Sequence, residues 1–245
     1  MLQLLTRLYR AYNYYISPDK FLVRRAIRQL FRPQRRYDKA LEIGAGIATL
    51  TQYLKAHADI SDYLTSDVDE SDTADVVCDA QAMPFEDGSY DLVVSFEVME
   101  HLPDPEAFIS ETARVLKDGG DAMLTLPFMY GRHDFADFHR WTELGLRRIF
   151  ERHGMEVKRL IKRGGTGLSC SRLLVNFIHD RVAAGHSGWR ARRSSARIIY
   201  GLMTIVLLPV NLLSWCLLVF DLIFDRNSAN ALGFVVLARK TPRQA

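Results

Sequence analysis

Cysteine is scarce in this chain of 245 residues: there are three, Cys78, Cys170 and Cys216, far apart in the sequence. No Cys-x-x-Cys pair occurs, so the sequence supports neither a disulfide framework nor a cysteine zinc site. The first fifteen residues contain Arg7 and Arg10 and lack a small-residue cleavage site. They do not resemble a signal peptide. We therefore expect a reducing, cytoplasmic compartment and no metal ion.

Charge is distributed unevenly, although the net charge is only +3. Residues 1–39 contain ten Lys/Arg and two acidic residues, and residues 181–245 contain nine Lys/Arg and two acidic residues. The segment between them contains 13 basic and 25 acidic residues. Basic ends around an acidic middle suggest a surface that meets nucleic acid or anionic lipid headgroups. The alternative is an arginine-rich helix surface exposed to water.

A glycine turn stands near the start of the acidic middle. An apolar strand at 39–43 runs into Gly44-Ala45-Gly46, and a helical pattern follows at 47–57. This order is typical of nucleotide-like ligand sites in open α/β sheets. The third glycine of the dinucleotide fingerprint is absent, since Thr49 stands there. Glu42, just before the turn, suits a cationic ligand and disfavours a pyrophosphate.

A second carboxylate follows the next strand. The segment 63–67 reads as a strand ending in Asp67, which lies 21 residues after Gly46. That spacing is close to the ~20 residues expected for a ribose-binding acid. A carboxylate can accept hydrogen bonds from both hydroxyls of a cis-diol, so the position suits a ribosyl ligand. Asp69 is a weaker candidate for the same role.

The remaining pattern alternates between strands and helices, as in an open parallel sheet. We expect amphipathic helices at 2–15 and 18–31, strands at 75–79, 91–96 and 122–127, a helix at 105–116 that ends at a glycine cap, a helix at 143–153, and strands at 154–161 and 233–240. The last strand is expected to insert antiparallel beside the strand at 154–161.

Several segments together resemble one family. They are Glu-x-Gly-x-Gly-x-x-Thr from position 42, Asp79-Ala-Gln-Ala-Met-Pro-Phe, Tyr90-Asp-Leu-Val, Glu100-His-Leu and Arg114-Val-Leu-Lys-Asp-Gly-Gly. In order and spacing they are similar to the class I S-adenosylmethionine-dependent methyltransferases, in particular a widespread bacterial group. The resemblance covers about residues 38–165. Met83 and Asp118 depart from the usual pattern.

This resemblance implies a Rossmann-like α/β fold with a seven-stranded, mostly parallel sheet and an antiparallel last strand. It also implies S-adenosylmethionine as the cofactor and an SN2 transfer of its methyl group. The residues implied to hold the cofactor are Glu42 for the ammonium group, Gly44, Ala45 and Gly46 for the methionine moiety, Asp67 for the ribose, Asp79 and Ala80 for the adenine, and Glu97 along the same cleft.

An oxygen acceptor needs a general base, and histidine is the usual one near neutral pH. His133 follows the fifth strand, at the edge where such sheets place ligands, and is our first candidate. His101, in the Glu-His-Leu segment, is the second, although a histidine at a helix start often only caps or packs. The acceptor itself, and methylation at oxygen, carbon or nitrogen, stay open.

A charge-free run of 23 residues extends from Ile198 to Phe220. That length could span a bilayer, but Pro209 and Asn211 interrupt it, and a single crossing would separate the strand at 233–240 from its sheet. With the basic stretch 189–197 before it, the run resembles a peripheral membrane anchor. A dimer interface or a lid on the protein is the alternative.

We expect an N-terminal helical cap at 1–37, a cofactor-binding core at 38–175, a basic and hydrophobic helical insertion at 176–230, and the last strand with a tail at 231–245. The expected partners are a small-molecule or lipid-linked acceptor and the inner membrane surface, contacted through 189–224. Nucleic acid is not expected, and a homodimer stays open. The alternatives are a non-catalytic membrane-associated module with the same fold and a nicotinamide-dependent reductase.

Overall fold

A computed structural model describes most of the chain. The described residues are 17–31, 35–46, 50–70, 72–132, 136–182, 208–225 and 229–242. They divide into two compact units. One contains the sheet, and its described residues are 24–31, 35–46, 50–70, 72–128, 138–161 and 234–242. The other contains a helical pair, and its described residues are 17–23, 129–132, 136–137, 162–182, 208–225 and 229–233.

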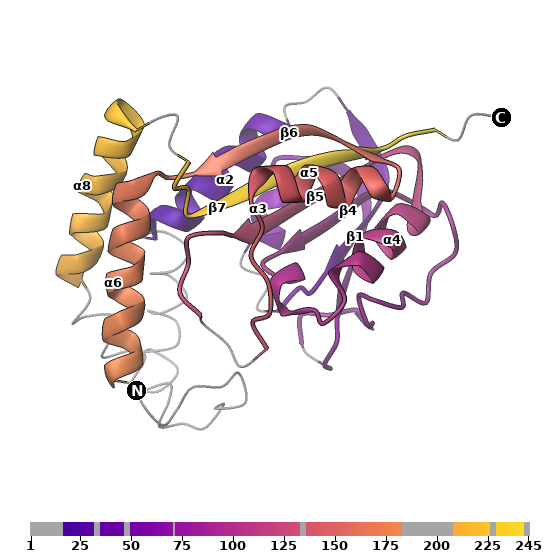
Figure 1. The fold of residues 1–245 in the computed structure, drawn as a ribbon. Helices are drawn as coiled ribbons and strands as arrows, with labels where there is room; N and C mark the ends of the chain where they lie inside the picture. The colour runs from indigo at the N-terminus through magenta and orange to yellow at the C-terminus, as the bar shows by residue number, and fades with distance from the viewer. Residues whose placement is uncertain are drawn as a thin grey trace. The chain divides into compact units, whose positions relative to one another are not determined.

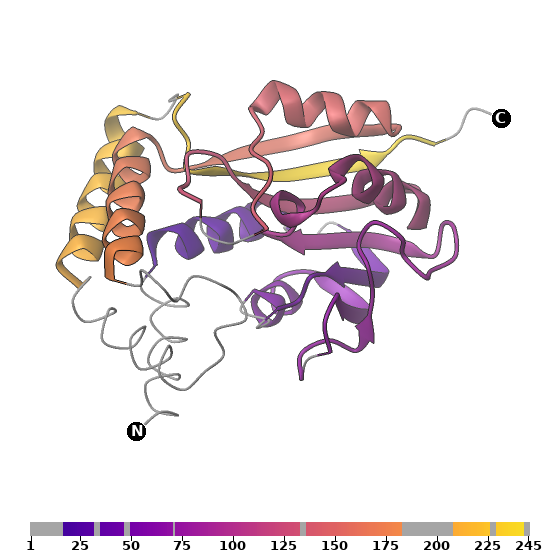
Figure 2. The same cartoon turned by 60° about the horizontal axis from the view of Figure 1, so that its bottom comes forward.

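The sheet has seven strands in the order β3-β2-β1-β4-β5-β7-β6 (Figures 1 and 2). Its strands are β1 (Arg36–Ile43), β2 (Asp59–Asp67), β3 (Val76–Val77), β4 (Tyr90–Phe96), β5 (Leu116–Pro127), β6 (Met155–Arg163) and β7 (Gly233–Lys240). The pairs from β3 to β5 are parallel, whereas the last strands are antiparallel. The predicted fold class is confirmed. Because the first five strands are parallel, their carboxyl ends share one edge.

The helices of the described chain are α2 (Pro18–Leu30), α3 (Thr51–Lys55), α4 (Pro105–Val115), α5 (Glu143–Arg152), α6 (Thr166–Val182) and α8 (Leu208–Phe224), with the short 3₁₀ turn η2 (Met99–His101). The helices α2, α4 and α5 start where the sequence predicts, and a side chain caps the start of two of them. Asp104 accepts a hydrogen bond from the Ala107 N–H at α4, and Thr142 accepts one from the Gly145 N–H at α5. The predicted helix at 2–15 lies outside the described residues.

The predicted glycine cap after α4 is wrong. The helix ends at Val115, because Leu116 already has an extended backbone (φ −71°, ψ 138°) and begins β5. Gly119, with φ +74°, lies inside that strand. The pairing of β4 with β5 shifts register between Tyr90 and Leu92, so this strand segment accommodates an irregularity, for which a left-handed glycine is well suited.

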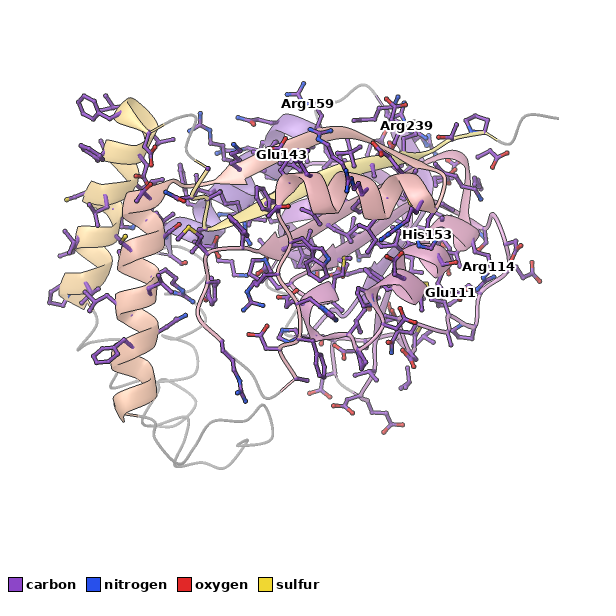
Figure 3. The ribbon with its side chains drawn as sticks, viewed as in Figure 1. Glu111, Arg114, Glu143, His153, Arg159 and Arg239 are labelled. Atoms are coloured by element: carbon purple, nitrogen blue, oxygen red, sulfur yellow. The ribbon has the colours of Figure 1, made fainter. Side chains whose placement is uncertain are left out.

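Arg114 of α4 binds the segment that follows β3. Its guanidinium donates to the carbonyl oxygens of Met83 and Phe85 (2.9 and 2.7 Å) and to the Glu111 carboxylate (2.7 and 2.8 Å; Figure 3). The hydrogen bonds from Arg114 lower the pKa of Glu111. This part of the family pattern therefore has a structural role: one arginine fixes the loop that carries Asp79 and Ala80.

The amino edge of the sheet is closed by a buried carboxylate. Asp121 of β5 is 0% exposed. It accepts hydrogen bonds from the Tyr37 hydroxyl (2.8 Å) and from Arg239 (2.7 and 3.1 Å), and it forms an ion pair with Arg35 (3.0 Å). Burial, with the nearby Asp121 charge, raises the pKa of Tyr37, so its hydroxyl stays a donor. The cluster joins β1, β5 and β7.

The second unit contains an antiparallel pair formed by α6 and α8, which lie side by side in both views (Figures 1 and 2). Asp221, near the end of α8, accepts hydrogen bonds from the N–H groups of Gly165, Gly167 and Leu168, each at 2.9 Å. Asp225 accepts one from Thr166 (2.8 Å). These carboxylates satisfy the free N–H groups at the start of α6 and face its positive end.

Within the described part of the apolar run, the predicted interruption at Asn211 is wrong. The helix α8 continues through Asn211, because Pro209 stands in its first turn, where a proline costs no hydrogen bond. Residues 198–207 lie outside the described residues. Among the helices that are described, none is long and apolar enough to cross a membrane.

Candidate cofactor site

The turn after β1 is bound to the end of β2. The N–H groups of Gly44 and Ala45 both donate to the Ser66 carbonyl oxygen (2.9 Å each). Two buried serines from the neighbouring strands bind the last carbonyls of β1: Ser66 binds Glu42 (2.9 Å) and Ser95 binds Ile43 (3.1 Å). The end of β1 is therefore fixed from both sides, and the turn has little freedom to move.

The two glycines of the turn are needed for different reasons. Gly44 has φ +72°, and a Cβ there would lie 2.3 Å from Cγ2 of Val98, which follows β4. Gly46 has φ +54°, but among the described residues a Cβ there would meet nothing closer than the Gly44 oxygen at 4.0 Å. Gly44 thus permits close packing, whereas the space at Gly46 stays open beside a backbone that can approach a ligand.

Asp67 ends β2 at the same turn. One carboxylate oxygen accepts the Gly46 N–H (2.7 Å) and the other accepts the Val68 N–H (2.8 Å). The side chain is buried, 6% exposed. Each oxygen has a second lone pair, so the carboxylate can still accept hydroxyl donors from a diol. The predicted ribose acid and the glycine turn are therefore in direct contact.

Glu42 lies behind this turn and is 1% exposed. Its two oxygens accept hydrogen bonds from the Thr51 hydroxyl (3.0 Å) and the Tyr63 hydroxyl (2.6 Å). Burial raises the pKa of Glu42, and these two hydrogen bonds oppose that rise. The carboxylate thus joins α3 and β2 to the end of β1. Its predicted contact with a cofactor ammonium group stays a prediction.

Glu97, directly after β4, has φ +56°, the only positive φ of a non-glycine residue in the described chain. Its N–H is held by the Thr125 carbonyl and hydroxyl oxygens, each at 3.1 Å. A side chain in this backbone region costs about 1–3 kcal/mol, and such residues gather at functional sites. The strain is a signal that the sequence does not contain, and it supports the prediction that Glu97 lines the site.

Asp79 and Ala80 follow β3. The Asp79 carboxylate is exposed and accepts hydrogen bonds from the Gln81 N–H (2.9 Å) and side-chain amide (3.2 Å). Ala80 is buried. The Gln81 amide oxygen in turn accepts the Asp104 N–H (2.9 Å), which connects this loop to the start of α4. The adenine role of Asp79 and Ala80 stays a prediction.

The two predicted bases have different outcomes. His133 lies outside the described residues. His101 ends η2, with its side chain 26% exposed and its Nε2 3.7 Å from the carboxylate of Glu100, which is fully buried. The loop before α5 is held at Glu100, whose carbonyl oxygen accepts hydrogen bonds from the backbone N–H groups of Phe138 (2.8 Å) and His139 (3.3 Å).

Comparison with known proteins gives matches to part of this chain. Residues 41–124 match the family described as "Methyltransferase domain". Tocopherol O-methyltransferase of Arabidopsis thaliana is 33% identical over 102 residues, which are 36% of this chain and 29% of that protein. Ubiquinone biosynthesis O-methyltransferase of Pseudomonas aeruginosa PAO1 is 34% identical over 103 residues, 34% of this chain and 42% of that protein. Over these residues the chain is similar to S-adenosylmethionine-dependent methyltransferases, in agreement with the resemblance seen in the sequence.

The matched part of this chain spans about a third of the length of these curated relatives. Among solved structures, phosphoethanolamine N-methyltransferase 2 of Haemonchus contortus in complex with S-adenosyl-L-methionine has a TM-score of 0.57 at 17% identity. That alignment covers 96% of this chain and 56% of the other. At this identity the likeness shows the fold.

The residues at the carboxyl edge fit S-adenosylmethionine, the cofactor of the family that the chain resembles. Gly46 leaves space that a Cβ would fill, and Asp67 offers carboxylate oxygens to a diol. The predicted family resemblance and cofactor are confirmed, whereas the individual roles of the cofactor residues stay predictions. No group of three or more His, Cys, Asp or Glu residues that could hold a metal ion occurs in the described part of the chain.

Replacing Gly44 with alanine tests the turn. The new methyl group would overlap Val98 and would hold a strained φ, so we expect G44A to weaken S-adenosylhomocysteine binding at least about tenfold and to lower the free energy of unfolding by about 1–3 kcal/mol. Titration calorimetry and urea unfolding measure both. G154A is the control, because Gly154 has φ +69° with nothing within 4 Å. Equal behaviour of both variants would refute the packing argument, and V98A added to G44A should restore part of the affinity.

A second prediction follows from the raised pKa of Glu42. The folded protein holds the proton of this buried acid more tightly than the unfolded chain does, so the stabilisation from protonation is complete below the usual pKa of 4.5 and is lost as pH rises through the raised pKa of the folded state. We expect the unfolding free energy of the wild type, minus that of E42Q, to fall as the pH rises above 4.5. Urea unfolding across this range measures it. A difference that rises with pH would contradict the assignment.

Proposed function

We propose that this protein transfers a methyl group from S-adenosylmethionine to an oxygen of a small-molecule acceptor. The observation that carries the proposal is the direct hydrogen bond between Gly46 and Asp67, which unites a glycine turn with a diol-binding carboxylate. The names of the two curated relatives, both O-methyltransferases, support oxygen as the nucleophile.

When bound, the cofactor supplies a methyl group on a sulfonium, already a strong electrophile. The protein's part is then alignment and exclusion of water. Asp67 would hold the ribose hydroxyls, and the open backbone at Gly46 would admit the methionine moiety. The strained Glu97 would line the cleft from β4. Glu42 would hold the turn in place, with an ammonium contact as its second role.

His101 is the base that the described geometry favours. Its side chain is partly exposed, and its Nε2 faces the buried carboxylate of Glu100 at 3.7 Å. A carboxylate at that distance would stabilise the imidazolium that forms when His101 takes the proton of an acceptor hydroxyl. His133 is the competing base that the sequence favours.

The finer part of the proposal concerns the acceptor. The apolar run, with its basic neighbour at 189–197, fits an enzyme that works at the cytoplasmic surface of a membrane on a lipid-linked acceptor such as a prenylated phenol. The competing function is a non-catalytic membrane-associated module with the same fold. Cofactor affinity separates the two.

Binding of S-adenosylhomocysteine, measured by titration calorimetry, tests the cofactor site. We expect D67N to bind at least about tenfold more weakly than the wild type, since its amide loses half of the acceptor capacity and the charge. D69N is the control, because Asp69 is exposed two residues further along. A wild type that is folded yet binds no S-adenosylhomocysteine would favour the non-catalytic module.

Transfer of tritiated methyl to 3,4-dihydroxybenzoate, alone and with a prenyl substituent, tests the base and the acceptor class. We expect H101Q to lower kcat by about 10²–10⁴-fold with unchanged S-adenosylhomocysteine affinity, and H139Q to have a smaller effect. A large loss in H133Q with normal rates in H101Q would assign the base to His133. Equal rates on both phenols would argue against a lipid-linked acceptor.

A further inference from the structure

The outward face of α8 is unusual for a protein surface. Among its exposed large side chains are Leu212 (62%), Val219 (53%), Phe220 (53%), Ile223 (60%) and Phe224 (72%). Their spacing of three, four and seven residues places them on one side of the helix. On the neighbouring α6, Leu173, Leu174 and Phe177 are also 40–57% exposed. Large apolar side chains gathered in this way mark a contact surface.

The opposite side of α8 is fixed to protein. Ser214, Leu218 and Asp221, which follow one another at four and three residues, are buried. Leu218 packs with Leu22, Leu168 and Leu232. The ring of Trp215 meets that of Phe21 edge-on, with centroids 5.2 Å apart. The exposed stripe therefore cannot be removed from water by rotating the helix.

No charged side chain interrupts the exposed stripe. The segment 208–224 contains no Lys, Arg or Glu, and its single acid, Asp221, is 3% exposed and bonded to three N–H groups at the start of α6. The negative charge is thus directed into the protein. An apolar face without exposed charge can enter the acyl boundary of a bilayer at little electrostatic cost.

We propose that this α6–α8 face docks on an anionic lipid surface, with α8 lying in the plane of the interface. The inference rests on the membrane part of the proposed function and names its contact surface. The chain just before α8 supports this occupant: Arg190, Arg192, Arg193 and Arg197 occur without any acid between positions 181 and 220. Such basic residues favour anionic headgroups, each contributing about 1 kcal/mol near the surface. A symmetric contact between two copies would bring like charges from both chains together, and their repulsion disfavours that occupant.

Flotation of the full chain with vesicles tests this surface. The wild type should bind vesicles of phosphatidylcholine mixed with phosphatidylglycerol. It should bind vesicles of phosphatidylcholine alone more weakly. The variant F220Q/I223Q/F224Q should bind the anionic vesicles about tenfold more weakly or worse. L144Q is the matched control: Leu144 is also 72% exposed but lies on α5, so its variant should bind as the wild type does.

Three results would overturn the inference. In the first, the wild type binds neither kind of vesicle. In the second, the triple variant binds the anionic vesicles as well as the wild type does. In the third, neither protein binds vesicles, and light scattering shows that the wild type is a dimer whereas the triple variant is a monomer. The face is then an interface between two copies. S-adenosylhomocysteine affinity, measured on the same samples, reports on the proposed function separately. Vesicle binding without cofactor binding would support this surface and refute the enzyme.

Discussion

The candidate site depends on one constraint, the attachment of the turn after β1 to the end of β2. Three consecutive N–H groups, those of Gly44, Ala45 and Gly46, donate to the Ser66 carbonyl and the Asp67 carboxylate. This geometry requires the register in which Ile43 pairs with Ser66. A slip of one residue would turn every side chain of the strand to the other face. The same pairing that builds the sheet therefore also sets the position of Asp67, the predicted ribose acid.

The two edges of the sheet are organised in opposite ways. At the amino edge, Asp121 is surrounded by a tyrosine and two arginines, so its charge is compensated and the strands are held together. At the carboxyl edge, open space at Gly46 and the strained Glu97 remain. Stabilising interactions are concentrated at the amino edge, where no ligand is expected. Backbone strain is tolerated at the carboxyl edge, where a ligand is expected. Arg114 extends this division, since it fixes a loop near the site without being part of it.

The sequence predicts those features whose signal is local. The glycine turn, the helix start at Asp104 and the last strand follow from patterns of a few residues, and the structure has them where expected. Features that depend on distant partners were missed or misplaced. Gly119 reads as a helix cap, yet its pairing with β4 places it in a strand. Glu42 reads as a ligand group, while Thr51 and Tyr63, far apart in sequence, bind both of its oxygens.

The clearest instance of this limit is Asp221. In the sequence it directly follows the charge-free run 198–220. In the structure it lies within α8, where its carboxylate caps α6, a partner more than fifty residues away. Three N–H donors replace the water that the buried acid has lost, so its burial costs little. Because the charge is satisfied internally, the rest of α8 can present apolar side chains outward. A single acid within an apolar helix is thus compatible with an uncharged outward face.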